Sequence, residues 1–319
     1  MDQPWREGAK EVNFRSFEDL ARIVRANFHR IPADIDIVVG IPRSGMIPAT
    51  MIALYFNVAL TDLEGLLEGR VISAGSQRAK GRVKTEPHQW KKVLLVDDSI
   101  QSGNSMKAAV DRLREQGRWD VVSCAVLGVQ EAEGKADLIF EICPAPRIFE
   151  WNMMHHPLLT SVCIDIDGVL CVDPTDEEND DGLRYQEFLT SAQPLHLPTY
   201  PVGAVVSSRL EKYRAETEAW LARHNVKYET LHLLDMTAEE RRRKRAHGTF
   251  KADVYRSNPN WRLFIESDPS QAEEIARLTG KAVVCINSMD ASKETRRGEI
   301  ERRLKRRLKR IAARFSGGA

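Results

Sequence analysis

Two pairs of carboxylates each accompany an apolar run that is typical of a buried strand. Asp97 and Asp98 come directly after VLLV, and Asp165 and Asp167 lie within CIDIDG. In an extended segment Asp165 and Asp167 point to the same side, because side chains alternate along a strand. Open α/β sheets bind ligands at the carboxyl ends of such strands. We therefore expect one chemical site at each pair, although an acidic turn is the plainer interpretation of either pair alone.

A turn rich in Ser and Gly follows the first pair and leads into a predicted helix. Its backbone N–H groups, its hydroxyls and the helix N-terminus together favour a bound phosphate. Asp97 and Asp98 can accept hydrogen bonds from two vicinal hydroxyls outside the phosphate pocket, so a ribose 5-phosphate fits the pattern. The alternative is an acidic turn that only caps the helix. The turn consists of Gln101, Ser102, Gly103, Asn104 and Ser105.

The segment VLLVDDSIQSGNS (93–105) resembles the phosphoribosyl pyrophosphate (PRPP) signature of type I phosphoribosyltransferases. The resemblance implies that Asp97 and Asp98 bind the ribose hydroxyls and that the turn holds the 5-phosphate. The turn departs from the commonest form at Asn104, where Gly is frequent, and has Ser where Thr is usual. Upstream, VVGIPRSGMIPA (38–49) looks like the family's pyrophosphate loop. The resemblance thus implies PRPP contacts from Arg43, Ser44 and Gly45, and from Lys80, Arg82 and Lys84 of a flexible catalytic hood.

The chemistry that this resemblance implies is displacement of pyrophosphate, bound to Mg²⁺, from C1 of PRPP by an acceptor. Its transition state is similar to an oxocarbenium ion, so charge neutralisation and positioning matter more than a strong base. A cationic hood, a metal and a phosphate loop lined by backbone amides suit this requirement. Inversion at C1 gives a β-ribofuranosyl product that still carries its 5-phosphate.

Four further segments resemble, in order along the chain, the motifs of haloacid dehalogenase (HAD) superfamily phosphatases. They are CIDIDGVL (163–170), AVVSSR (204–209), HGTFKADVY (247–255) and LFIESD (263–268). The resemblance implies a nucleophile at Asp165, a general acid and base at Asp167, a phosphate ligand at Ser207 and a balancing cation at Lys251, with Lys244 as the alternative cation. It also implies a second Mg²⁺ site at Asp165, Asp167, Glu266 and Asp268.

The interval between the first two of these motifs is short, which predicts a phosphatase without a large cap domain. Such an open site would accept bulky substrates. The interval contains the acidic run DPTDEENDD (173–181), which we interpret as a solvated loop rather than a metal site. His155 and His156, next to Pro157, are interpreted as linker residues rather than ligands.

The elements that position these residues alternate in type almost throughout the chain. Strand-like apolar runs and segments of helical period predict an α/β protein with parallel sheets. The first helix opens at a capping box formed by Ser16 and Asp19. Strands are predicted at 37–41, 92–98, 121–128 and 138–142, helices at 46–56 and 104–116, a hairpin between about 68 and 90, and later strands near 161–166, 202–206, 228–234, 262–266 and 282–286.

The fold class that follows is α/β, with two doubly wound parallel-sheet domains and a basic C-terminal helix. By resemblance these are a type I phosphoribosyltransferase fold and a capless HAD fold, which is Rossmann-like. The predicted boundaries are 1–150 for the phosphoribosyltransferase domain, 151–160 for a connector, 161–290 for the phosphatase domain and 291–319 for the helix.

Composition supports two ordinary domains. The 319 residues are 42% hydrophobic, which is enough for two cores. Since 47 Lys and Arg nearly cancel 46 Asp and Glu, the net charge of +1 excludes a globally basic nucleic-acid coat. The five cysteines form no CxxC pair, so we expect reduced thiols without disulfides or zinc. No apolar run of 18 residues and no signal-peptide pattern is present, so a cytoplasmic protein is expected.

A strongly basic segment, SKETRRGEIERRLKRRLKRIAARF (292–315), predicts an amphipathic helix. A basic amphipathic helix favours peripheral attachment to anionic lipid, here at the inner face of the membrane. The alternative of equal weight is a helix packed on the protein body or on a second subunit of a homo-oligomer. Nucleic acid is disfavoured, because the segment has a single aromatic residue. Its apolar stripe is Ile300, Leu304, Leu308, Ile311 and Phe315.

Fusion of the two domains predicts sequential chemistry, in which the second removes the phosphate that the first attaches. Covalent linkage raises the effective concentration of the intermediate at the second site. The combination resembles the PRPP-dependent ribofuranosyltransferases of bacterial polysaccharide assembly, so we favour a glycan acceptor, lipid-linked at the membrane. The alternatives are a nucleobase phosphoribosyltransferase coupled to a 5'-nucleotidase, and a PRPP-sensing regulatory protein.

Overall fold

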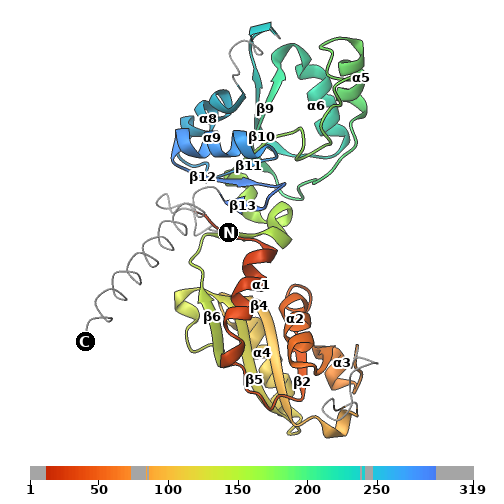
Figure 1. Cartoon of the computed structure of the whole chain (residues 1–319), viewed down its shortest axis with the longest axis vertical. Coiled ribbons are helices and arrows are strands. Elements are labelled where there is room, and N and C mark those ends of the chain that lie inside the picture. The colour runs from red at the N-terminus through yellow and green to blue at the C-terminus, as the bar shows by residue number, and fades with distance from the viewer. Residues whose placement is uncertain (1–11, 73–83, 85, 238, 241–246, 292–319) are drawn as a thin grey trace, which may run out of the picture. The chain divides into compact units, whose positions relative to one another are not determined.

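The computed structural model describes residues 12–72, 84, 86–237, 239–240 and 247–291. These residues form two units, each with its own parallel sheet (Figure 1). Residues 15–147 form the five-stranded unit, and the described residues of 1–14 and 148–319 form the six-stranded unit. The chain therefore passes between the units twice, at 14–15 and at 147–148, whereas the predicted phosphoribosyltransferase domain spans 1–150 and leads into a connector.

The five-stranded unit contains a sheet in which every neighbouring pair of strands is parallel. In spatial order the strands are β3 (Ala59–Asp62), β2 (Ile37–Gly40), β4 (Lys92–Ile100), β5 (Asp120–Gly128) and β6 (Leu138–Ile142). The chain runs from β2 to β3 on one side of β2 and then crosses to β4 on its other side. The topological switch point therefore lies between β2 and β4.

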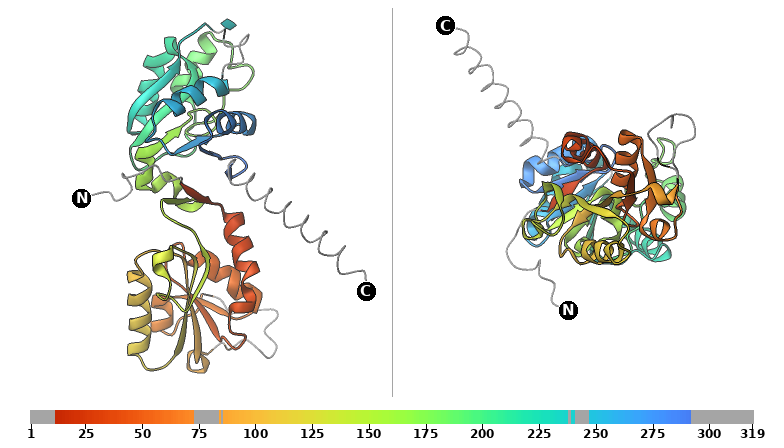
Figure 2. Two further views of the ribbon diagram at one scale, coloured as in Figure 1. Left: turned by 90° about the vertical axis from the view of Figure 1, so that its left-hand side faces the viewer. Right: turned by 90° about the horizontal axis from the view of Figure 1, so that it is seen from below.

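Helices cover both faces of this sheet, because its buried strands are apolar on both sides. Ile37, Val39, Val93 and Leu95 pack with the apolar stripe of α4 (Asn104–Glu115) on one face. α1 (Phe17–Ala26) and α2 (Met46–Phe56) contact the sheet, and Figures 1 and 2 show them on the opposite face from α4. The predicted capping box of Ser16 and Asp19 is present at the start of α1.

The hairpin predicted between about 68 and 90 is only partly described. α3 (Leu63–Leu67) follows β3 and precedes this region, and the 3-10 helix η2 (Pro87–Gln89) lies within it. Residues 73–83 and 85 lie outside the described part. Earlier in the chain, α1 ends at Ala26 and is followed by the 3-10 helix η1 (Phe28–Arg30).

The six-stranded unit has five parallel strands and one antiparallel edge strand, which sequence patterns did not predict. In spatial order the strands are β10 (Tyr228–Leu234), β9 (Val202–Leu210), β8 (Val162–Ile164), β11 (Leu263–Glu266), β12 (Ala282–Cys285) and β13 (Asp290–Ala291). The chain runs from β8 through β9 to β10 and then crosses to β11, on the other side of β8. The switch point therefore lies between β8 and β11.

Alternating side chains of β8 divide the core of this unit into two layers. Val162 and Ile164 pack with α5 (Leu183–Ser191) and α6 (Arg214–Arg223). Cys163 packs with α8 (His247–Ser257) and α9 (Pro269–Thr279). Figure 1 shows these two helices on the opposite side of the sheet from α5 and α6. The six-stranded unit is thus covered by helices on both faces, in agreement with a doubly wound α/β fold.

The predicted connector 151–160 is a packed part of the six-stranded unit rather than a free linker. It lies in the 3-10 helices η4 (Glu150–His155) and η5 (Pro157–Ser161), whose buried apolar residues belong to the core. It follows a short two-stranded sheet of β1 (Asn13–Arg15) and β7 (Arg147–Phe149). The buried residues are Met153, Met154, Leu158 and Leu159.

Several smaller expectations have a direct outcome. The five cysteines are buried and form no disulfide in the described structure. His155 contacts Thr199 and His156 accepts a hydrogen bond from the amide of Leu158, so both are structural. No helix in the described ranges has the length and apolar character needed to cross a bilayer. Residues 292–319, with the predicted basic helix, lie outside the described part.

Candidate active sites

The first candidate site lies at the switch point of the five-stranded unit. Asp97 and Asp98 are within β4, which extends to Ile100. The turn after β2 brings the predicted pyrophosphate loop to them, because the Ser44 hydroxyl donates a 2.8 Å hydrogen bond to Oδ1 of Asp98. Arg43 is exposed on the same turn, and the peptide bond before it is cis. Two segments that are 54 residues apart in sequence therefore meet at one edge of the sheet.

Gly45 permits this close approach of the turn to β4. A Cβ atom at this position would lie 2.5 Å from the carbonyl oxygen of Ile41 and 2.8 Å from that of Val96. It would also lie 3.0 Å from Cα of Asp97. All three neighbours are backbone atoms, which cannot rotate away as a side chain can, so only glycine fits between β2, α2 and β4.

The two neighbouring carboxylates create an excess of negative charge at this edge. Asp98 is 5% exposed, and its backbone N–H donates to Oδ1 of Asp97 at 2.9 Å. Burial, and then the charge of Asp98, raise the pKa of Asp97 to about 8. The buried Arg147, which sequence reasoning missed, donates to the carbonyl of Ile100 at 3.0 Å. Burial lowers the pKa of Arg147, whereas the charge of Asp98 opposes that change.

The predicted phosphate turn joins β4 to α4. Gly103, at a φ of +81°, is the N-cap of α4 and offers no side chain to its first amides. Those amides carry the positive end of the helix dipole, which favours an anion. The stem of Lys135 lies over the turn, since a Cβ on Gly103 would be 2.9 Å from Lys135 Cδ. No motif marked Lys135, which is exposed. Four of the turn residues are exposed, namely Gln101, Ser102, Asn104 and Ser105.

The predicted hood cations are not placed at this site by the described structure. Lys80 and Arg82 lie outside the described residues. Lys84 pairs with Asp36 at 2.5 Å, and Asp36 also accepts from the N–H of Lys92, the first residue of β4. Asp97 is five residues further along β4, or about 17 Å at 3.3 Å per residue. In the described structure Lys84 therefore lies at the amino edge of the sheet, and its contact with PRPP stays a prediction.

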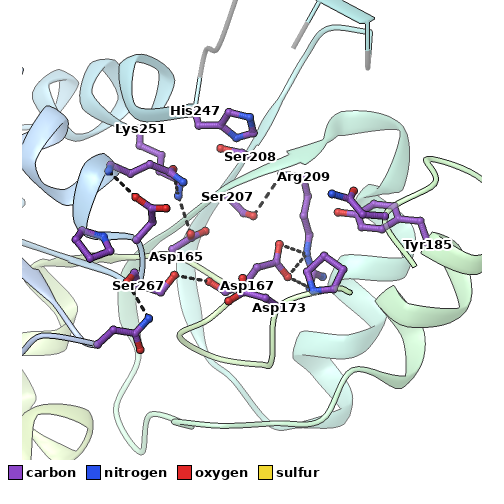
Figure 3. Close-up of a pocket in the computed structure, with 16 residues that line it drawn as sticks. Asp165, Asp167, Asp173, Tyr185, Ser207, Ser208, Arg209, His247, Lys251 and Ser267 are labelled. Atoms are coloured by element: carbon purple, nitrogen blue, oxygen red, sulfur yellow. Dashed lines mark hydrogen bonds and ion pairs between the residues drawn. The ribbon is translucent and has the colours of Figure 1, made fainter. Parts of the chain in front are cut away.

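The second candidate site is built around the buried Lys251 of α8. Its ammonium donates to Asp165 at 2.6 Å, as Figure 3 shows. It also donates to Glu266 at 2.7 Å and to Gln271 at 2.9 Å. Asp165 follows β8 and Glu266 ends β11, so the two carboxylates meet at the switch point. Burial lowers the pKa of Lys251, but the charges of Asp165 and Glu266 outweigh burial and raise it. The ammonium therefore stays charged between two carboxylates.

Asp167 is held by a different cation. Arg209, on β9, donates to both carboxylate oxygens through Nε at 3.2 and 3.1 Å and to Oδ1 through Nη2 at 2.6 Å. The Arg209 side chain is fully buried, whereas that of Asp167 is 20% exposed. Burial lowers the pKa of Arg209, but the charge of Asp167 outweighs this and raises it. Sequence reasoning missed Arg209, although it ends the motif AVVSSR.

Asp165, Asp167, Arg209 and Lys251 line a pocket of about 370 Å³. Ser207 reaches it from β9, and Figure 3 shows Ser207 between Lys251 and Arg209. The acidic run 173–181 also contributes, through Asp173 and Asn179. Burial, followed by the charges of Asp167 and Asp165, raises the pKa of Asp173. Asp173 and Asn179 are both exposed. The run therefore borders the pocket as a solvated loop, as predicted.

The four carboxylates predicted to bind a second Mg²⁺ are not gathered as a metal site. Asp165 and Glu266 bind Lys251, and Asp167 binds Arg209. Asp268 is exposed and accepts from the N–H of Gln271, as the N-cap of α9. Within the described ranges, no three acidic, histidine or cysteine side chains are grouped to hold a metal ion. This arrangement does not fit the predicted magnesium site.

Comparison with known proteins concerns the first site. A family model described as "Phosphoribosyl transferase domain" matches residues 13–152. Adenine phosphoribosyltransferase of Nitrosomonas europaea is 30% identical over 122 residues, which cover 34% of this chain and 70% of that protein. Adenine phosphoribosyltransferase 5 of Arabidopsis thaliana is 31% identical over 112 residues, which cover 33% and 58%. The first relatives are matched over about half to three fifths of their own length.

Among solved structures, the Helicobacter pylori xanthine-guanine-hypoxanthine phosphoribosyltransferase aligns with 44% of this chain and 92% of its own, at 20% identity and a TM-score of 0.34.

Proposed function

Because the chain belongs to the phosphoribosyltransferase family, we propose that its five-stranded unit transfers a 5-phosphoribosyl group from PRPP to an acceptor and releases pyrophosphate. The observation that carries the proposal is the hydrogen bond from Ser44 to Asp98. It joins the pyrophosphate loop to the ribose-binding acids at the edge of the sheet where such folds bind ligands. The uncapped N-terminus of α4 then receives the 5-phosphate.

The residues of this unit have distinct roles in the proposed reaction. Asp97 and Asp98 accept hydrogen bonds from the ribose hydroxyls and hold C1 toward the acceptor. Arg43 and the backbone around Gly45 bind pyrophosphate as it takes up the electrons of the C1–O bond. The excess negative charge at Asp97 and Asp98 fits a cation bound with PRPP beside them. Mg²⁺ on PRPP supplies neutralisation of the leaving pyrophosphate.

Isothermal titration of the full chain with PRPP and Mg²⁺ tests this assignment without knowledge of the acceptor. The double variant Asp97→Asn/Asp98→Asn should lose at least about 100-fold in affinity, since two charge-assisted contacts disappear. The matched control is Asp34→Asn/Asp120→Asn, which removes two carboxylates near Lys92 at the opposite edge of the sheet. Equal affinity in the test and control variants would overturn the PRPP site.

We also propose that the six-stranded unit hydrolyses a phosphate ester. Asp165 attacks phosphorus, the ester P–O bond breaks, and the leaving oxygen takes a proton from Asp167. Water then transfers a proton to Asp167 as it attacks the aspartyl-phosphate, and phosphate leaves. Lys251 offsets the charge of Asp165, and Ser207 binds a phosphate oxygen. The support is the convergence of these four side chains on one pocket at a switch point.

The substrate of this unit is proposed to be the 5-phosphate of the ribosylated product. For the acceptor, the sequence favours a glycan hydroxyl through the basic segment 292–315. A nucleobase is the second candidate, and the names of the adenine phosphoribosyltransferase relatives support it. PRPP turnover with adenine, guanine, hypoxanthine and uracil, against turnover with lipid-linked glycans from bacterial membranes, separates the two.

A further inference from the structure

We propose that Arg209 is a positioning residue for Asp167 in the phosphate-ester hydrolysis proposed above, on which this inference rests. Arg209 grips Asp167 in the two-pronged geometry that guanidinium and carboxylate groups favour. The grip fixes the carboxylate against the floor of the pocket. Arg209 does not itself touch the substrate in this proposal, and it acts through Asp167.

In the described structure, the surroundings of Arg209 offer it few partners other than Asp167. Its side chain is fully buried, and its Nη1 has no hydrogen-bond partner in the described structure. Asp167 is therefore its main anionic partner, with the sulfur of Cys171 as a further contact at 3.3 Å. Lys251 serves two carboxylates on the other side of the pocket. Arg209 thus pairs with Asp167, whereas Lys251 pairs with both Asp165 and Glu266.

The three contacts from Arg209 hold the carboxylate of Asp167 in one orientation at the pocket. That orientation matters when Asp167 accepts a proton from the water that attacks the aspartyl-phosphate. In that step the water oxygen forms a bond to phosphorus, the bond from phosphorus to the Asp165 oxygen breaks, and the water proton moves to Asp167. Arg209 therefore acts on the second half of the reaction, in which the aspartyl-phosphate is hydrolysed.

The test uses p-nitrophenyl phosphate, whose leaving group needs no proton, so the water step limits the rate. Arg209→Met should lower kcat by about 10- to 100-fold with KM changed less than about 3-fold. Rapid quenching and intact-mass measurement should show one added phosphoryl group on this variant. Arg209→Lys should not restore kcat, because an ammonium lacks the planar fork. Arg214→Met is the matched control, since Arg214 pairs only with surface carboxylates Glu211 and Glu218 among the ion pairs of the described residues.

A double-mutant cycle separates positioning from a purely structural role. In an Asp167→Asn background, Arg209→Met should change kcat less than about 2-fold, because the group that it positions is already lost. Additive losses, full rescue by lysine or absence of the phosphoryl adduct would each overturn the role of Arg209 while the hydrolase stands. If the parent hydrolyses neither p-nitrophenyl phosphate nor ribose 5-phosphate, the proposed function fails and the positioning role fails with it.

Discussion

Asp97 holds a proton more tightly than an exposed aspartate, because burial and the charge of Asp98 both disfavour its anion. A ligand that brings hydroxyl donors and a cation removes this conflict. The free site therefore has an unfavourable charge arrangement, which the proposed binding of PRPP would relieve. Such a cost in the unliganded state is common where two carboxylates are brought together for binding.

The first prediction is that Asp97→Asn stabilises the five-stranded unit increasingly as pH rises. The folded pKa, about 8, is above the ordinary 3.8, so between these values the unfolded chain has released a proton that the folded unit retains. The parent thus loses stability relative to the variant by up to ~1.4 kcal/mol per pH unit between about pH 4 and 8. Hydrogen exchange of the β4 amides measures the difference.

Asp111→Asn, on the exposed face of α4, is the control and should follow the parent across this pH range. A stability difference for Asp97→Asn that shrinks with rising pH would contradict the assigned charge conflict.

Residue-level prediction from sequence worked where a motif fixes the backbone and failed where a side chain reaches across the fold. Asp98 and Ser44 were identified separately, and the switch point brings them into contact. Lys84 is predicted at PRPP, and in the described structure it pairs with Asp36. Arg209 was missed because a pairing with Asp167, 42 residues away, has no local signal.

At the scale of elements, Gly45 fixes how closely α2 and its preceding turn approach β4. Gly45→Ala should force the turn away from Asp97, because the new methyl group would meet the carbonyl oxygens of Ile41 and Val96. We expect a loss of about 1–3 kcal/mol in the free energy of unfolding and of at least about 10-fold in PRPP affinity. Calorimetric unfolding and PRPP titration measure the two effects.

Leu54→Ala tests the same helix at a site that is 77% exposed, and should leave PRPP affinity unchanged. Tight PRPP binding by Gly45→Ala would show that the close contact between the turn and β4 is not required.

Long, apolar strands were predictable, whereas short elements were not. The predicted 138–142 and 228–234 coincide with β6 and β10, because periodicity and flanking turns define them. β3 has only four residues and β13 only two, which is too few for a recurring pattern. The segment 151–160 is predicted as a connector, but tertiary packing of its Met and Leu residues places it in the core of the six-stranded unit.

At the scale of the whole chain, the basic segment 292–315 is the reason why a lipid-linked glycan is proposed as the acceptor. Removal of residues 293–319 should abolish salt-sensitive sedimentation with vesicles of anionic lipid, because the Lys and Arg residues contribute about 1 kcal/mol each near such a surface. PRPP binding should stay unchanged, since no predicted site residue lies in this segment. Neutral vesicles are the control and should sediment little of either protein.

If the full chain does not sediment with anionic vesicles, and truncation instead splits an oligomer, the segment has a structural role. The proposal of a lipid-linked glycan acceptor then loses its support in the sequence, and a nucleobase becomes the better candidate.

The proposed functions of the two units rest on different kinds of support. The five-stranded unit matches a known family through residues 13–152, whereas the role of the six-stranded unit rests on its pocket and on motif resemblance. One proposal connects the two units: the six-stranded unit removes the phosphate carried in by PRPP before the product leaves.

The measurement that tests this claim most directly follows two labels from one PRPP molecule, ¹⁴C in the ribose and ³²P in the 5-phosphate. The parent, Asp165→Asn and the control Asp253→Asn, exposed on α8, are each given this PRPP with nucleobases or with membrane-derived glycans. We expect the parent and the control to give acceptor-bound ¹⁴C without ³²P. Asp165→Asn should give both labels on the acceptor in equal amounts. Equal labels in the product of the parent would contradict the proposal.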